Sequence, residues 1–125
     1  MNSPQARIRY LQDSIDTASP AKLLVMLYDR LVLDLLQGEE AVRGNDRDTA
    51  SDRINHAQEI ILELRTTLDL DAWDGAAGLA ALYGFLLTEL IQAHIKLDAD
   101  RIAACRGIVE PLRDAWREAA LTMAG

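Results

Sequence analysis

Two histidines and one cysteine are the residues of this chain best suited to metal binding or nucleophilic chemistry. They are His56, His94 and Cys105. A di-metal carboxylate site in a helical bundle needs a Glu three residues before a His on each of two helices. Arg53 and Ile91 stand at those positions, so the pattern is absent. With one cysteine and two separated histidines, a zinc site is equally unsupported, and we expect neither a metal nor a cofactor.

The other arrangements that support catalysis are also missing from the sequence. His56 and Glu59 match one ligand spacing, but an exposed pair on a helix surface explains this match better. His94 and Cys105 are not accompanied by a glycine-rich elbow or an oxyanion loop. We therefore expect that the protein is not an enzyme and that Cys105 is a small core residue.

Length and charge narrow the class of protein further. The chain has 125 residues, 50% of them hydrophobic, and a net charge of −7. This length suits one domain with one core. Because nucleic acid and anionic lipid would repel such a chain, we expect no nucleic-acid partner and no membrane insertion. The lone cysteine and the lack of a continuous apolar signal segment favour a cytoplasmic location.

Apolar periodicity and capping residues divide most of the chain into four helices. Ser19 and Pro20 suit the start of the first helix, and Gly44 can end it. We expect helices over 20–43, 46–68 and 76–97, and a fourth that follows Asp98 and Asp100 and ends near Ala120.

Short connections between these helices make neighbours antiparallel. The predicted fold class is all-α, an antiparallel up-down four-helix bundle over residues 19–122. Pro111 lies inside the last predicted helix, where it removes an amide donor and crowds the carbonyl of Gly107. We therefore expect a bend between these two residues.

Residues 1–18 lie outside the predicted bundle and are expected to form a short mobile N-terminal segment. Ile8 and Leu11 stand three apart, which makes this part of the segment amphipathic. Such a segment could lie on the bundle and leave it again at low cost. A frayed terminus explains the same residues equally well.

The first and third predicted helices are apolar beyond the narrow stripe that a four-helix core needs. Between Leu23 and Leu36 the first helix has only three charged residues, Asp29, Arg30 and Asp34. So apolar a helix must be surrounded by partners. The surplus favours a groove for an amphipathic partner helix. An irregular bundle with a central first helix is an equally good explanation.

Several short motifs occur in an order that is specific although each is weak alone. They are Tyr10, Thr17-Ala18-Ser19-Pro20, Met26-Leu27-Tyr28-Asp29, Ala57-Gln58-Glu59-Ile60-Ile61-Leu62-Glu63-Leu64, Leu68-Asp69, Leu82-Tyr83-Gly84-Phe85-Leu86 and Leu112-Arg113-Asp114-Ala115-Trp116. Together they resemble the flagellin export chaperones of the FliS family, from Tyr10 to about Glu118. Arg30, His94 and Pro111 depart from the family pattern.

The resemblance implies a cytoplasmic chaperone that binds the C-terminal segment of flagellin and prevents its premature polymerisation. It also implies delivery of the client to the cytoplasmic domain of the flagellar type III export gate. The alternative is a self-associating helical adaptor without a flagellin client. In that case the apolar surplus pairs with a second copy to form a homodimer.

With this resemblance, we expect a client-binding groove between the second and third helices. Its expected residues are Asn55, Gln58, Ile61, Leu62, Tyr83, Leu86 and Leu87. Leu62 and Tyr83 are the better candidates because they sit beside the main apolar stripes, whereas Ile61 and Leu86 fit an ordinary core equally well. Asn55 and Gln58 share a helical face with Leu62 and could hydrogen-bond the client backbone.

The N-terminal segment then acquires a role as a groove cap. Ile8, Tyr10 and Leu11 would cover the apolar groove in the free protein until the client displaces them. A cap of this kind lowers the affinity for the client by the population of the open state, and it protects the groove from aggregation.

Overall fold

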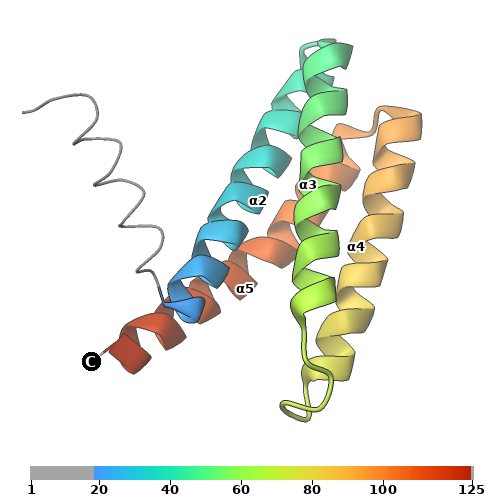
Figure 1. Ribbon diagram of the computed structural model, residues 1–125. Helices are drawn as coiled ribbons and strands as arrows, with labels where there is room; N and C mark the ends of the chain where they lie inside the picture. The colour runs from blue at the N-terminus through green and yellow to red at the C-terminus, as the bar shows by residue number, and fades with distance from the viewer. Residues whose placement is uncertain (1–18, 125) are drawn as a thin grey trace, which may run out of the picture.

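The computed structural model describes residues 19–124, which form four helices. They are α2 (Pro20–Arg43), α3 (Arg47–Thr67), α4 (Ala76–Lys96) and α5 (Ala99–Ala124). Successive helices run in alternating directions (Figure 1). The predicted all-α, up-down four-helix architecture is thereby confirmed, and α5 extends past its expected end near Ala120. The expected N-terminal segment, residues 1–18, lies outside the described residues.

The residues before three of the helices cap them as the sequence predicts. The Ser19 hydroxyl accepts a hydrogen bond from the Lys22 amide at 3.2 Å. The Asp46 carboxylate accepts one from the Thr49 amide, also at 3.2 Å. Asp98 does the same for the Arg101 amide, at 3.1 Å. Because each cap satisfies an amide that the helix itself leaves unpaired, the local sequence fixes where these helices begin.

Gly44 ends α2, as the sequence predicts, but the left-handed residues at the helix ends are not glycines. Gly44 caps α2 with a φ of −89°, so it does not use the left-handed freedom of glycine. The left-handed residue is Asn45, with a φ of 59°. Leu97 at the end of α4 is also left-handed, with a φ of 49°. Asn tolerates this conformation through its short polar side chain, whereas for Leu it stores strain.

Helix α2 packs along both α3 and α5, and α4 closes the bundle against the same two neighbours. No Cα atoms of α2 and α4 lie within 8 Å of each other, so these two helices are diagonal partners. The expectation that α2 is surrounded by partners is therefore met on two of its sides. The outward face of α2 still carries exposed leucines, among them Leu33 and Leu36.

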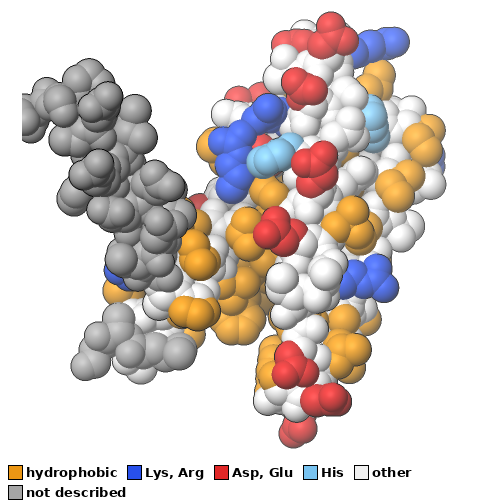
Figure 2. Space-filling model, in the orientation of Figure 1, with side chains coloured by type: hydrophobic (Ala, Val, Ile, Leu, Met, Phe, Trp, Pro, Cys, Tyr) orange, Lys and Arg blue, Asp and Glu red, His pale blue; other side chains and the backbone are white. Residues whose placement is uncertain are grey.

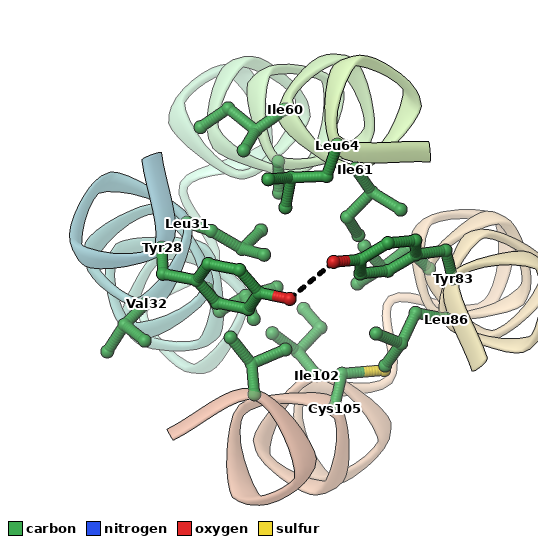
Figure 3. Close-up of a cluster of buried hydrophobic side chains, with 14 of the residues drawn as sticks. Tyr28, Leu31, Val32, Ile60, Ile61, Leu64, Tyr83, Leu86, Ile102 and Cys105 are labelled. Atoms are coloured by element: carbon green, nitrogen blue, oxygen red, sulfur yellow. Dashed lines mark hydrogen bonds between the residues drawn. The ribbon is translucent and has the colours of Figure 1, made fainter. Parts of the chain in front are cut away.

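The centre of the core contains a pair of tyrosines from the two diagonal helices. The hydroxyls of Tyr28 in α2 and Tyr83 in α4 are hydrogen-bonded at 2.5 Å (Figure 3). Around them pack aliphatic side chains of all four helices, such as Leu31, Ile61 and Ile102. Burial raises the pKa of both phenols, so both remain protonated and neutral at physiological pH.

A buried ionic cluster joins α2 to α3. The carboxylate of Asp34 is fully buried and lies 3.2 Å from the Arg30 guanidinium and 3.3 Å from that of Arg53. His56 Nδ1 also contacts this carboxylate. The expectation of an exposed His56–Glu59 pair is therefore wrong, because His56 turns toward the charge that α2 buries beside it. A buried carboxylate needs such partners to offset its desolvation.

Pro111 lies inside α5, and the helix continues through it to Ala124. The bend that we expect between Gly107 and Pro111 stays a prediction.

The single thiol of the chain is part of the core, as the sequence predicts. Cys105 is 2% exposed, and burial raises the pKa of its thiol to about 11. Compared with a thiol of the ordinary pKa of 9.0, the thiolate form of Cys105 is about 100-fold scarcer at pH 8.

We predict that iodoacetamide labels Cys105 at least 100-fold more slowly in the native protein than in 6 M guanidinium, about the factor set by this pKa shift alone. Mass spectrometry of timed samples checks this rate, and equal rates in the two conditions would show that the thiol is accessible in the fold.

Candidate binding surface

The bundle exposes large apolar side chains, chiefly on α2 and α4. On α4, Phe85, Ile91 and Ile95 are 50%, 49% and 72% exposed. On α2 the exposed set comprises Leu23, Met26, Leu33 and Leu36. The expected apolar surplus on the first and third predicted helices is therefore confirmed. Patches of this kind mark sites where a protein binds partners.

Over residues 77–95 the outward arc of α4 carries no charged residue, and the exposed Lys96 follows at the end of the helix. Helical periodicity places on it Ala77, Ala80, Ala81, Gly84, Phe85, Leu87, Thr88, Ile91, Gln92 and Ile95. Figure 2 shows hydrophobic side chains along the length of this helix, at the right of the view. The carboxylate of Glu89 lies on the other flank and pairs with Arg101 of α5 at 2.9 Å. The flank opposite Glu89, with Leu87 and Ile91, is therefore the one beside α3.

Helix α3 contributes a matching flank. Its residues Arg53 and His56 face α2, where they contact Asp34. The opposite edge of its buried stripe must therefore face α4, and Leu62, Gln58 and Asn55 lie just beyond that edge. Leu62 is 50% exposed. We call the surface formed by these flanks the α3–α4 face.

Polar character on the α3–α4 face is limited. Asn55 is exposed and Gln58 is half-buried. Arg65, near the end of α3, brings a charge to this flank. No ion pair joins α3 to α4 among the described residues. A partner on this face would meet apolar side chains, the two amides and the half-buried His94 of α4, with Arg65 at the end nearer the α3–α4 connection.

Three of the expected groove residues lie in the core instead. Ile61, Leu86 and Tyr83 are 0%, 1% and 2% exposed. For Tyr83 the expected place beside the core stripe is wrong, because its hydroxyl crosses the bundle to Tyr28. Ile61 and Leu86 take the ordinary core role that the sequence left open.

The other expected groove residues share the α3–α4 face. They are Asn55, Gln58, Leu62 and Leu87. Leu87 is half-buried and packs on the edge of the core. The expected cap residues, Ile8, Tyr10 and Leu11, fall outside the described residues.

Ile95 is the surface residue that the sequence analysis missed. Leu87, Ile91 and Ile95 stand four residues apart, so they form one continuous ridge along α4. The sequence contains this spacing. Because the whole helix is apolar, several apolar stripes can be drawn along it, and this one does not stand out.

The described residues offer little for other kinds of chemistry. Within them, no group of three or more His, Cys, Asp or Glu side chains is placed to hold a metal ion. Helix α4 is long and apolar enough, by length and composition alone, to cross a membrane. In the structure it is one wall of the bundle, with Leu86 and Leu90 in the core, and core helices of soluble proteins pass the same test.

An all-α bundle with a largely apolar exposed face has the architecture of helical proteins that bind amphipathic partner segments. The model of the family described as flagellar protein FliS matches residues 1–123. The chain belongs to the FliS family.

Relatives with similar sequences carry one description. The flagellar secretion chaperone FliS of Bacillus subtilis is 34% identical over 110 residues, which cover 88% of this chain and 82% of that protein. The protein of the same description from Vibrio cholerae is 29% identical over 107 residues, covering 85% and 79%. A solved structure described as a flagellar chaperone from bacteria superposes with a TM-score of 0.76 at 23% identity, over 94% of this chain and 97% of that one. At this identity the superposition supports the fold alone.

Two substitutions test whether Tyr83 belongs to the core and Leu62 to the α3–α4 face. Tyr83→Ala removes a buried ring and the partner of the Tyr28 hydroxyl, and we predict a loss of about 3–5 kcal/mol of unfolding free energy. Leu62→Asp replaces a half-exposed side chain, and we predict a loss below about 1 kcal/mol. Urea denaturation followed by circular dichroism measures both. Similar losses for the two variants would contradict the placement of these residues.

Proposed function

We propose that this protein is a cytoplasmic export chaperone that binds the C-terminal segment of flagellin. In this role it prevents premature polymerisation of the client and delivers it to the cytoplasmic domain of the flagellar type III export gate. The single observation that carries the proposal is the uncharged apolar arc of α4 beside Leu62 of α3. Membership of the FliS family, with relatives described as flagellar secretion chaperones, supports a flagellar client and a flagellar export apparatus as partners.

The α3–α4 face suits an amphipathic client segment. The ridge of Leu87, Ile91 and Ile95 offers apolar contacts at the spacing of successive helical turns, so a client helix could pack along it. Gly84 adds space, because beyond its chain neighbours and the nearby backbone of α4 no atom lies within 4 Å of the position that its Cβ would occupy. A client that is disordered alone loses conformational entropy on binding, and therefore needs a long apolar interface for useful affinity.

Polar groups at the rim would set the register of the client. The amides of Asn55 and Gln58 can donate to and accept from client backbone that is not paired within a helix. Leu62 lies between them on the helical wheel and would contribute the central apolar contact of α3.

The cap of the free protein belongs to the same proposal. Ile8, Tyr10 and Leu11 would shield the apolar face until the client displaces them. The competing function is a self-associating adaptor, in which the same face pairs with a second copy. Size-exclusion chromatography with and without the client separates these two functions.

Calorimetric titration with a peptide of about 40 residues from the C-terminus of the organism's own flagellin tests the function. We predict one-to-one binding with a Kd in the micromolar range or tighter, and a negative heat-capacity change because apolar surface is buried. Absence of heat at several temperatures, with the protein folded, would favour the self-associating adaptor.

Leu62→Asp tests the site within the same titration. We predict at least tenfold weaker binding of the peptide, since a carboxylate would be buried against apolar client side chains. The matched control is Leu33→Asp, which changes an exposed leucine of α2, the helix diagonally opposite α4. Equal losses in the two variants would place the client elsewhere.

Removal of residues 1–14 tests the cap. We predict tighter binding of the flagellin peptide, because the open state no longer competes with a bound segment, together with lower solubility of the free protein. Calorimetry and a sedimentation assay measure the two effects. The cap is abandoned if affinity and solubility both stay unchanged.

A further inference from the structure

An apolar hollow lies between the first turns of α2 and the last turns of α5. Figure 1 shows these two ends side by side at one end of the bundle. The hollow has a volume of about 240 Å³ and is lined by Lys22, Val25, Met26, Arg117, Ala120 and Leu121. Met26 and Leu121 are 50% and 70% exposed, so apolar surface is open to solvent here.

Two cations stand at this hollow in a protein that is acidic overall. Lys22 lies in the first turn of α2, where the helix dipole disfavours a positive charge and where no acidic residue compensates it. Among the described residues, no carboxylate lies within ion-pair distance of Lys22. Arg117 donates through one guanidinium nitrogen to Asp29 at 2.7 Å. Its other N–H groups remain available to an anion.

We propose that this hollow receives the C-terminal end of the client chain. The terminal carboxylate would pair with Lys22 and Arg117, and an apolar side chain near the end would occupy the space between Met26 and Leu121. This proposal rests on the proposed function, because a client bound through its C-terminal segment brings one free carboxylate to the surface of the bundle.

The two cations and the apolar lining of the hollow favour a C-terminal chain end over an internal segment of the client. An internal apolar segment has no charge to match the two cations, and an amino terminus would be repelled by them. A terminal carboxylate next to an apolar side chain matches both features over a short stretch of chain. Capture of a chain terminus by positioned donors is a recurring mode of peptide recognition.

Two forms of one peptide test the proposal. The first is the free acid of the last 40 or so residues of flagellin, and the second is the same peptide with an amidated C-terminus. Amidation removes the charge and leaves every side chain in place. We expect the amidated peptide to bind the unmodified protein about tenfold more weakly in calorimetry, as for the loss of one charge-assisted contact.

The lysines of the chain supply a matched pair of variants. Lys22→Gln should weaken binding of the free acid about tenfold and abolish the difference between the two peptides, as a double-mutant cycle requires. The control is Lys96→Gln at the end of α4, the other lysine of the sequence, where the full effect of amidation should persist.

Each outcome of these titrations supports or overturns the terminal anchor. If both peptides bind the unmodified protein equally well, the terminal anchor is wrong while the proposed function stands. If Lys22→Gln weakens both peptides by the same factor, Lys22 meets another group of the client and the proposal fails. If neither peptide binds at all, the proposed function fails together with the anchor.

Discussion

Two tyrosine hydroxyls meet in the middle of this bundle, and the remaining architecture is arranged around their hydrogen bond. Tyr28 and Tyr83 come from diagonal helices whose backbones do not approach each other closely, so the pair spans the core from α2 to α4. A buried hydroxyl without a hydrogen-bond partner lowers the free energy of unfolding. The distance between α2 and α4 is therefore constrained to the separation at which the two hydroxyls meet. Tyr83 lies on the same buried stripe of α4 as Leu86 and Leu90, so the apolar side chains on the other side of this helix, such as Phe85, Ile91 and Ile95, remain exposed. The hydrophobic face of the protein is thus a consequence of how its core is closed.

The ion pairs that stabilise the bundle lie away from the α3–α4 face, where the client is proposed to bind. Salt bridges and the buried Asp34 cluster connect α2 to its two neighbours, and Glu89 connects α4 to α5. The α3–α4 face has no ion pair between its helices among the described residues, and its exposed apolar side chains are not needed to fill the core. In the proposed function, the helices that form this face need not rearrange, so the binding free energy is reduced mainly by displacement of the cap. The proposed anchor between α2 and α5 differs, because Arg117 both pairs with Asp29 and would meet the end of the client chain.

The sequence predicted the local features of this protein well, because capping and periodicity act over a few residues. The bounds of α2 and the capping roles of Asp46 and Asp98 follow from residue types alone. Pairings between distant segments were not predictable in this way. Tyr83 lies 55 residues from its partner, and His56 lies 22 residues from Asp34, so nothing in either helix indicates the contact. Leu62 of the expected groove is consequently at the surface, Tyr83 is in the core, and the binding role of the surface residues stays a prediction.

In the proposed complex, the outward side chains of α3 and α4, and not the core, contact the client. Intermolecular NOEs from an isotope-labelled chaperone to an unlabelled flagellin C-terminal peptide detect these contacts. We expect NOEs from the client to the methyl groups of Leu62 and Ile91, and none to those of Ile61 and Leu86. NOEs to the two core residues, or to neither pair while the peptide is bound, would contradict it.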